Sequence, residues 1–477
     1  QTQPSSDHKV QVQPRFLTGS NGLYRWQGKL SGKSGDSQYL VNLNTLWQDG
    51  YRDHSNARST DVNAVAKHNI NDRLSLTAVL NVYDAPYLLN PSSLDKATAT
   101  TAPTSARGFV KNQGAAKKIR QGQGGVTLQY RDDADTRADI TVYGVGRTLF
   151  NPIPGRIIDL SRRAGGIRTL YSRRFVAGET QIRVTTGADL ELLSDTRKEW
   201  SNGGVSTVTS DASIFDNLSF GAQGLDQDEQ VFGVGPFAEV ELSPSPNWIV
   251  TVGGRYDRYR FKVDDNLLSD GVDDSGSRVM DQFSPMAGIT YRPHAFVNLY
   301  SNFSTAFQTP TTTELSNQAS REGGFNPNLD PERLRGFEAG MKGGWPDQRL
   351  SWDAAIFLFN IDNMVIPFQI NDPTTEEVFF RNAGKSKNKG FEAKVGWSPV
   401  EELRLSMAYT IMKFEFDDFT VVRDVNSIPT SIQLAGNDIP GVPPQHVFAG
   451  ISYRHRSGVF AETNLQWIDE YFGNDFN

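Results

Sequence analysis

The sequence predicts an all-β protein that crosses a membrane as an antiparallel β-barrel. Three features predict this fold: long segments in which apolar and polar residues alternate, connections that alternate between tight turns and long loops, and no apolar run long enough for a membrane-spanning helix. Such a helix needs about 18 or more consecutive apolar residues. The best apolar run here covers only residues 354–359, so we exclude a helical membrane protein.

Alternation with a period of two identifies the strands. In residues 73–82, leucine, alanine and valine at even positions alternate with mostly polar residues, and residues 403–411 and 459–467 repeat the pattern. Successive side chains of a strand point to opposite faces, so each segment has one apolar and one polar face. Many segments have about 10–16 residues, longer than is usual in soluble proteins. We expect 19 strands, at about 10–17, 23–31, 37–49, 60–69, 73–84, 121–131, 137–149, 166–175, 180–195, 229–242, 247–263, 279–292, 295–305, 333–343, 349–370, 377–397, 402–417, 441–454 and 458–471.

The connections between these segments fall into two length classes. The short ones are residues 32–36, 69–72, 132–135, 176–179, 243–246, 292–294, 344–348, 398–401 and 455–457. The long ones include residues 85–120, 150–165, 196–228, 264–278, 306–332 and 418–440. Alternating short turns and long loops are typical of a transmembrane barrel, with the turns in the periplasm and the loops outside the cell.

Aromatic residues recur at both ends of the strands. Trp248 and Tyr291 lie near short turns, whereas Tyr87 and Phe150 lie near long loops. Two aromatic girdles are expected where a barrel crosses both bilayer interfaces. The alternative is a soluble solenoid, propeller or multi-domain sandwich, but such a fold would not need long strands with two classes of connection.

The strand count predicts an incomplete barrel. Bacterial barrels have an even number of strands because both termini lie in the periplasm. Nineteen strands ending on the long-loop side therefore predict that residues 1–477 are a single barrel portion that lacks its last three strands. An unclosed barrel would expose bare strand edges to lipid. Three more strands would give 22, a size class whose lumen is plugged.

Composition and motifs exclude several function classes. The chain has no cysteine, which excludes a disulfide scaffold, a thiolate metal site and a cysteine nucleophile. Its 6 histidines lack metal-ligand spacing, so we expect neither a metal nor a cofactor. A net charge of −7 argues against nucleic-acid binding. No nucleophile elbow, phosphate-binding loop or zinc-protease motif is present, so we expect no enzyme activity.

Several motifs in a fixed order resemble those of the TonB-dependent outer-membrane receptors, of the siderophore-receptor type. They are residues 49–53 (DGYRD), 300–315 (YSNFSTAFQTPTTTEL), 326–332 (NPNLDPE), 336–340 (GFEAG), 382–384 (NAG), 389–393 (KGFEA) and 439–446 (IPGVPPQH). The resemblance covers nearly the whole chain. It implies a 22-stranded barrel preceded by a globular plug, in a Gram-negative outer membrane. Neither a plug-like segment nor a TonB box precedes the first predicted strand.

The resemblance also implies a function. Receptors of this family bind a scarce nutrient, typically a ferric siderophore, with extracellular loops and the plug, and TonB supplies the energy for its uptake. We therefore expect TonB, an anionic ferric siderophore, outer-membrane lipid and lipopolysaccharide as partners, and a monomeric receptor. The alternative from another class is a passive, porin-like channel without a plug.

A repeated motif predicts contacts with the plug. If the aromatic and alanine residues of Gly-Phe-Glu-Ala face lipid, Glu338 and Glu392 face the lumen, because a lipid-facing glutamate is disfavoured. By resemblance, such glutamates pair with arginines of the plug. The alternative is that they are ordinary lumen residues bridging neighbouring strands.

Positive charge is concentrated in one segment. Residues 105–175 contain 14 Lys and Arg against 5 Asp, a local charge of +9 in a chain of net charge −7. Arginine binds carboxylates in pairs, and a positive field attracts anions. The cluster centres on two adjacent predicted loops, 85–120 and 150–165. We predict that the following residues bind an anionic ferric siderophore of carboxylate or catecholate type: Lys117, Lys118, Arg120, Arg156, Arg162, Arg163 and Arg168. Lipopolysaccharide phosphates or an acidic plug are the alternative partners of this cluster.

Haem is the main competing ligand. By resemblance, haem receptors carry an iron-ligating histidine in the loop that corresponds to residues 306–328, where this chain has none. His54, elsewhere in the chain, leaves haem open. Phe307 and Gln308, at the start of the predicted loop 306–332, are also expected at the ligand site. Cobalamin and oligosaccharides stay possible. The acidic segment 264–274 matches no calcium-loop pattern, and a solvated loop is the preferred interpretation.

Overall fold

The computed structural model describes residues 9–132, 135–316, 318, 324–345, 347, 349–368, 379–382, 384–425 and 428–476. Nineteen strands form one antiparallel sheet, as the alternation predicts. They are β1 (Gln11–Gly19), β2 (Leu23–Ser34), β3 (Ser37–Gln48), β4 (Ala57–Asn69), β5 (Leu74–Leu89), β6 (Ala116–Asp132), β7 (Thr136–Ile153), β8 (Arg156–Ala177), β9 (Thr180–Val205), β10 (Leu218–Ser245), β11 (Trp248–Asp265), β12 (Gly276–His294), β13 (Val297–Gln308), β14 (Glu332–Gly344), β15 (Leu350–Asp362), β18 (Lys385–Val400), β19 (Leu403–Asp418), β22 (Gln445–Arg454) and β23 (Phe460–Ile468).

Four short strands and a few helical turns lie in the connections. The strands are β16 (Val365–Phe368), β17 (Phe379–Asn382), β20 (Thr420–Val425) and β21 (Ile428–Gln433). The helical segments are α1 (Lys96–Thr101), α2 (Gly108–Asn112), α3 (Thr312–Ser316) and the 3-10 turns η1 (Ala212–Asn217) and η2 (Leu268–Asp270). None of the helices in the described part of the chain is long and apolar enough to cross a membrane.

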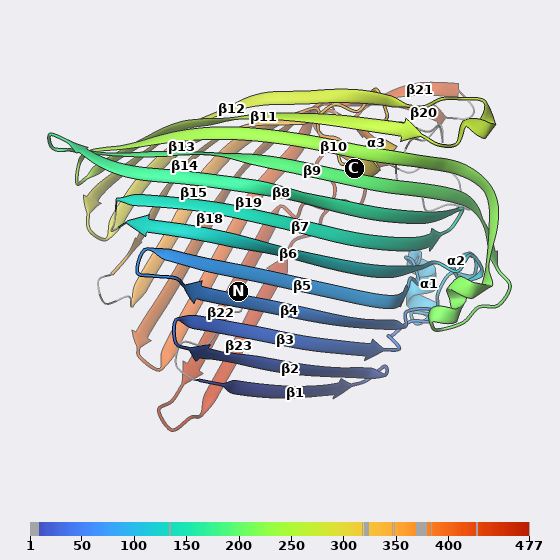
Figure 1. Cartoon of the computed structure of the whole chain (residues 1–477), viewed down its shortest axis with the longest axis horizontal. Helices are drawn as coiled ribbons and strands as arrows, with labels where there is room; N and C mark the ends of the chain where they lie inside the picture. Colours follow the sequence, from blue (N-terminus) through green and yellow to red (C-terminus); the bar gives the residue numbers. More distant parts are fainter. Residues whose placement is uncertain are drawn as a thin grey trace.

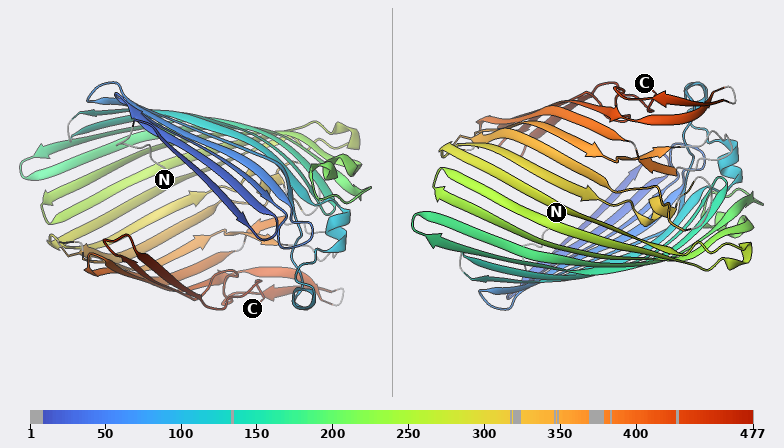
Figure 2. Two further views of the ribbon diagram at one scale, coloured as in Figure 1. Left: turned by 90° about the horizontal axis from the view of Figure 1, so that it is seen from below. Right: turned by 90° about the horizontal axis from the view of Figure 1, so that it is seen from above.

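The long sheet curls into the wall of a barrel (Figures 1 and 2). Each long strand pairs with its sequence neighbours, from β1–β2 through to β22–β23. Within the described residues, no ladder joins β1 to β23. The prediction that three further strands complete the barrel stays a prediction.

The register separates an apolar outer face from a polar inner face. On β8, Ile167 and Tyr171 are 42% and 43% exposed, and on β11 Val252 is 55% exposed, as expected for side chains that face lipid. The residues that alternate with these along the strands point to the other face, where arginine, aspartate and glutamate recur. The polar inner face is therefore the lumen wall.

The strands β7 to β11 extend far above the apolar band, and here the predicted loop boundaries are wrong. The predicted long loop 150–165 is a tight turn at Pro154 and Gly155, with Gly155 at φ 86°, and the flanking residues belong to β7 and β8. The predicted loop 196–228 shrinks in the same way to the connection between β9 and β10. Above the bilayer both faces of a strand meet water, so the apolar alternation that identifies strands is lost there.

Two other predicted strands are interrupted. The segment predicted as a strand at 349–370 divides into β15 and β16 around Asn363, whose φ is 58°. The segment predicted at 377–397 divides into β17 and β18, and its residues 377 and 378 lie outside the described residues. In both cases the chain leaves the barrel wall to form the small β16–β17 hairpin.

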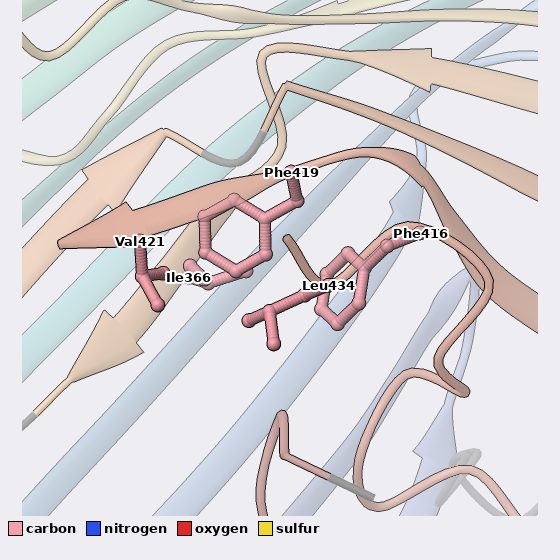
Figure 3. Packing of buried hydrophobic residues seen from close by; sticks show 5 residues of the cluster. All are labelled: Ile366, Phe416, Phe419, Val421 and Leu434. Atoms are coloured by element: carbon pink, nitrogen blue, oxygen red, sulfur yellow. The ribbon is translucent and has the colours of Figure 1, made fainter. Parts of the chain in front are cut away.

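The loops on the long-loop side have small cores of their own. Ile366, Phe416, Phe419, Val421 and Leu434 form one buried cluster, in which the β16–β17 and β20–β21 hairpins meet the end of β19 (Figure 3). A second cluster joins the wall to the connection between β13 and β14, and a third lies beneath the connection between β9 and β10. These cores fix the loops against the upper rim of the barrel.

Candidate functional site

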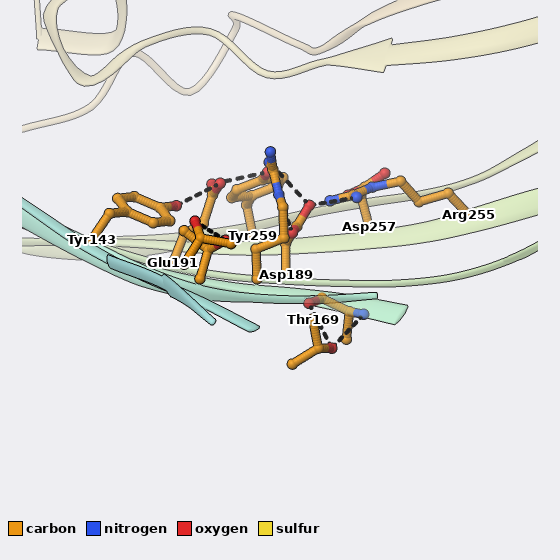
Figure 4. Close-up of polar contacts among 11 residues, drawn as sticks. Tyr143, Thr169, Asp189, Glu191, Arg255, Asp257 and Tyr259 are labelled. Atoms are coloured by element: carbon orange, nitrogen blue, oxygen red, sulfur yellow. Dashed lines mark hydrogen bonds and ion pairs between the residues drawn. The ribbon is translucent and has the colours of Figure 1, made fainter. Parts of the chain in front are cut away.

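A network of charged side chains covers the lumen face of β8 to β11 (Figure 4). Arg168 donates to Asp189 with Nε 2.7 Å from Oδ1, and Arg255 donates to the other oxygen of Asp189, also at 2.7 Å. Arg255 in turn donates through Nε to Asp257 at 2.7 Å. The Asp189 carboxylate is nearly buried and accepts from two guanidinium groups, so its negative charge is well compensated.

Glycines allow this network to cross intervening strands. Arg255 on β11 reaches Asp189 on β9 over Gly235 of β10, where a Cβ would collide with the guanidinium group. Tyr143 on β7 reaches Glu191 on β9 over Gly166 of β8, and a Cβ at Gly166 would lie 2.6 Å from the Tyr143 hydroxyl. Side chains of non-adjacent strands converge in this way on the concave face of a curved sheet. The network therefore confirms that this face is the inside of the barrel.

Higher on the same wall, a second network contains two of the predicted ligand residues. Arg162 donates Nε and Nη2 to Asp195, at 2.9 Å to Oδ1 and 2.5 Å to Oδ2. Asp195 is 1% exposed. Arg156 and Arg197 donate to opposite oxygens of Glu199, each at 2.5 Å. These paired charges form a buried ladder beneath the extracellular rim.

The connection between β13 and β14 folds into the lumen and binds to this ladder. The Thr312 hydroxyl accepts from Arg162 Nη2 at 3.3 Å. The Ser316 hydroxyl donates to Glu229 Oε1 at 2.8 Å and accepts from Gln227 at 3.2 Å. Leu315, between them in α3, is fully buried against the wall. The connection is thus anchored to the lumen wall by both hydrogen bonds and apolar packing.

Leu315 belongs to an apolar cluster that includes one predicted site residue. Phe261, Met280 and Leu329 complete its buried part, and Phe307 packs against it. The side chain of Phe307 therefore helps to seat the connection between β13 and β14. Gln308, the next residue, is exposed at the top of β13. The predicted ligand contacts of both residues stay predictions.

The structure divides the seven predicted basic residues between the two faces of the wall. Lys117, Arg156, Arg162 and Arg168 share the lumen face, whereas Lys118, Arg120 and Arg163 point outward, on the face that carries the apolar band. The expectation that the cluster centres on two long loops is wrong, because all seven residues lie on β6 and β8. Residues on opposite faces of a strand cannot line one site, so we do not place the three outward residues in a lumen site.

Pairing also changes the electrostatics expected from the basic segment. Its counter-charges follow on β9, where Asp189, Asp195 and Glu199 lie directly beside Arg168, Arg162 and Ile158 in register. The window of residues 105–175 ends just before these carboxylates. Their spacing at odd positions through β9 is the signal that identifies them, because it places them on the face of the arginines.

Arg147 faces the lumen and belongs to the basic segment 105–175, but it is not among the seven predicted ligand residues. It lies on β7 directly opposite Arg162 in the ladder. Its Nε is buried and has no hydrogen-bond partner, and no described residue forms an ion pair with its guanidinium group. A buried, unsatisfied donor is costly, so a ligand that accepts a hydrogen bond here would gain from that deficit.

An aromatic patch faces the lumen on the opposite part of the wall. The rings of Phe357, Phe359 and Phe414 have centroid separations of 5.4 to 6.3 Å. Phe357 is the register partner of Glu338, which places the patch beside one of the predicted plug contacts. Aromatic side chains of this kind pack against planar or apolar parts of a ligand.

Glu338 and Glu392 face the lumen, as the repeated motif predicts. Phe337 and Phe391, next to them in sequence, are 48% and 36% exposed on the outer face. Glu338 accepts a hydrogen bond from the Tyr300 hydroxyl at 2.8 Å. Glu392 is exposed and has no ion pair among the described residues. Their contact with a plug stays a prediction.

His54 is not presented to a ligand in this structure. It is 7% exposed, and its Nε2 lies 2.9 Å from the Ala115 carbonyl oxygen. Burial lowers the pKa of its imidazole, and the nearby Lys111 ammonium group adds to the effect. Among the described residues, no group of three or more carboxylate or imidazole side chains is arranged to hold a metal ion.

Comparisons with known proteins agree on the fold and the family. Residues 5–477 match the family described as TonB dependent receptor-like, beta-barrel. A curated relative, the probable TonB-dependent siderophore receptor PiuA of Acinetobacter baumannii, is 26% identical over 237 residues. That match covers 49% of this chain and 31% of the relative, so it spans less than a third of the relative's length.

Solved structures share the architecture at low sequence identity. The crystal structure of PiuA from Acinetobacter baumannii has a TM-score of 0.76 at 16% identity, covering 99% of this chain and 73% of that one. The unliganded ferric citrate transporter FecA has a TM-score of 0.74 at 17% identity, covering 98% of this chain and 66% of that one. At this identity the likeness shows the fold.

Proposed function

Because this chain belongs to the TonB-dependent receptor family, whose barrels lie in the outer membrane of Gram-negative bacteria, we propose that it takes up an anionic ferric siderophore with energy supplied through TonB. The curated relative named above is a siderophore receptor, which supports this substrate class. Membership of this family supports a role as a receptor and transporter. The siderophore and the coupling to TonB are the proposal.

The observation that carries the proposal is the lumen wall at Arg147. This arginine faces the lumen with an unsatisfied Nε, next to the loop anchored by α3. Arg162, directly opposite, has Nε and Nη2 occupied by Asp195. A carboxylate or catecholate oxygen of the ligand would complete the hydrogen bonds of Arg147. A charge-assisted bond of this kind contributes about 1.5–3 kcal/mol.

Lys117 provides a second positive charge on the same face, at the start of β6 and nearer the extracellular rim. It is exposed and makes no ion pair within the described part of the chain. We infer that Lys117 meets an anionic ligand first and that Arg147 binds it deeper in the lumen. Arg156, Arg162 and Arg168 then act mainly by holding the wall in shape, because carboxylates already occupy them.

The first test identifies the ligand class. An iron-starved strain that lacks its other receptors, and carries the full-length protein, is supplied with ferric complexes of carboxylate, catecholate and hydroxamate type. We expect growth on one anionic complex, and we expect it to disappear when TonB is deleted. Growth that persists without TonB would show a passive channel, and growth on haem or cobalamin alone would replace the proposed substrate class.

The second test uses two arginines that occupy neighbouring positions on paired strands but point to opposite faces of the wall. Arg147 points into the lumen, whereas Arg163, paired with Gly146 next to it, points outward. Arg147→Ala should weaken binding of the growth-supporting complex about tenfold or more. Arg163→Ala should leave it unchanged. Equal effects of both substitutions, or an Arg147→Ala receptor with full affinity, would contradict the assigned site.

A further inference from the structure

A groove crosses the outer face of β8 to β11, opposite the lumen networks. Its volume is ≈ 820 Å³. Two neighbouring rows of the sheet supply its outward side chains, which are Arg163, Ser194, Gln230 and Lys262 in one row and Leu192, Phe232 and Arg260 in the next. The groove is therefore part of the barrel wall and does not depend on a loop.

The groove lies at the upper edge of the apolar band. Along β11, the outward residues change from Val252 and Tyr256, which are 55% and 37% exposed, to Arg260 and Lys262. The apolar floor of the groove is formed by Leu192 and Phe232, which are 62% and 46% exposed. Acyl chains meet charged headgroups at this level of a barrel.

The two arginines of the groove have unoccupied guanidinium groups. Neither Arg163 nor Arg260 forms an ion pair or a side-chain hydrogen bond within the part of the chain that the structure describes. Lys262 is paired with Asp264 at 2.6 Å, so it contributes less charge. Most arginines of the lumen wall, in contrast, are bound to carboxylates. An unoccupied guanidinium fork matches the oxygens of a phosphate group.

The spacing favours a ligand with more than one phosphate. Arg163 and Arg260 lie three strands apart, which corresponds to about 14 Å across the sheet. Because arginine side chains are long, the distance between the two guanidinium groups can differ from this spacing by several ångström. A single phospholipid headgroup does not span this distance, whereas a phosphorylated disaccharide with several acyl chains does.

We propose that this groove binds the lipid A part of lipopolysaccharide. Arg163 and Arg260 would hold its phosphates, and its acyl chains would pack on Leu192 and Phe232. A siderophore inside the barrel has no access to this face. The outward position that excludes Arg163 from the lumen site thus gives it a function at the membrane surface.

The test compares the lipid that accompanies the protein out of the membrane. Wild type and the Arg163→Ala, Arg260→Ala double variant are extracted from outer membranes in mild detergent, and the lipopolysaccharide retained per protein is measured. Binding of fluorescent lipid A is then titrated. Each arginine near a charged membrane surface contributes about fivefold in affinity, so we expect about a 25-fold loss in the double variant. Heat-modifiable migration on gels verifies that the barrel is folded.

Three controls make the result specific. Arg173→Ala removes an outward arginine of β8 near the short-turn side, and Arg147→Ala removes a lumen arginine, so both should bind lipid A as the wild type does. Lipid A without its phosphates should bind the wild type weakly. Full lipid A binding by the double variant would overturn the proposal. Equally strong binding of phosphatidylglycerol would replace lipopolysaccharide by any anionic lipid. Siderophore uptake tests the lumen site separately.

Discussion

Arg162 and Arg168 lie on the same strand, and each pairs with an aspartate of β9. The two aspartates differ in whether another arginine would still bind them after the first is removed. Asp195 depends on Arg162 for two strong hydrogen bonds, whereas Asp189 would keep Arg255 if Arg168 were lost. Asp195 is 1% exposed, so a single substitution leaves a buried charge without compensation. The two arginines differ in their partners and also in exposure, since the side chain of Arg162 is 25% exposed and that of Arg168 is 62% exposed.

We predict that Arg162→Ala destabilises the folded barrel by about 3–5 kcal/mol, the usual cost of an unpaired buried charge. Arg168→Ala should cost about 1 kcal/mol, because the Arg168 side chain is 62% exposed and its partner stays paired. The temperature at which the compact band converts to the unfolded band on gels measures both. Equal shifts in the two variants would contradict the role given to Asp195.

His54 predicts a local dependence on pH. Its pKa is lowered from the ordinary value of 6.5 because burial disfavours the charged imidazolium. The unfolded segment therefore takes up a proton at a higher pH than the folded one. Stability is constant above about pH 6.5 and falls as the pH drops from there toward the lowered pKa.

Hydrogen exchange of the segments around His54 and Ala115 measures this effect, because the imidazole joins the two through the Ala115 carbonyl oxygen. Protection should decrease in the wild type as the pH falls below about 6.5. In His54→Asn it should be independent of pH over that range, since asparagine does not titrate and tolerates the positive φ of 58°. The same decrease in both proteins would exclude His54 as its cause.

At the scale of the element, the sequence predicts the strands where they cross the bilayer but not their continuation above it. Inside the band, one face of each strand meets lipid, so the period of two is present and all 19 wall strands can be located. Above the band the constraint ends, and the polar segments around Pro154 and Gly155 look like a loop although they continue as β7 and β8.

The same limit explains the candidate site. Lumen-facing charges such as Glu338 follow from alternation, but the partners of Arg162 on β9 depend on the register between two strands, which one sequence does not contain. The anchoring of α3 on Glu229 and Gln227 is a contact between segments about 90 residues apart, and no local pattern marks it. Arg147 becomes a candidate only once the structure shows that its Nε has no hydrogen-bond partner.

Glycines in the wall give an element-scale prediction. Gly166→Ala should destabilise the barrel by about 1–3 kcal/mol, because its Cβ would lie 2.6 Å from the Tyr143 hydroxyl and also press on the Leu190 carbonyl of β9. The control is Gly146→Ala on β7, whose Cβ would meet no atom within 4 Å, and which should change stability by less than about 0.5 kcal/mol.

Thermal unfolding of the two variants by the gel assay gives the comparison. The Gly166 variant should also lose the hydrogen bond from Tyr143 to Glu191, which crosses β8 only because the glycine leaves room. A Gly166→Ala barrel as stable as Gly146→Ala would mean that the neighbouring strands can shift apart without cost. The idea that glycines hold the lumen network together would then be wrong.

At the scale of the whole molecule, one wall presents three chemically distinct surfaces. Its inner face holds most of its charges in pairs, the outer face is apolar through the bilayer, and the outer rim above it carries the unpaired Arg163 and Arg260. Uptake and lipid binding can therefore be separated by substitutions on adjacent residues. Arg147 and Arg163 are the clearest case. Arg163 pairs with Gly146, the neighbour of Arg147, but the two arginines point to opposite faces of the wall.

The orientation of the barrel gives the last prediction. Residues 1–477 contain no cysteine, so a cysteine introduced here reports on one position when labelling is compared with that of the parent protein. Ala97 in α1 lies on the long-loop side and Glu179 in the turn between β8 and β9 lies on the short-turn side, and both are exposed. Long loops of such barrels face the exterior and short turns face the periplasm, with an apolar band of about 25 Å between them.

In intact cells, a maleimide that cannot cross membranes should label Ala97→Cys almost completely and Glu179→Cys hardly at all. After the outer membrane is permeabilised, both should react equally. Labelling of Glu179→Cys in intact cells would mean that the barrel is inserted the other way round, and the lumen site and the lipid groove would then both lie at the wrong membrane surface.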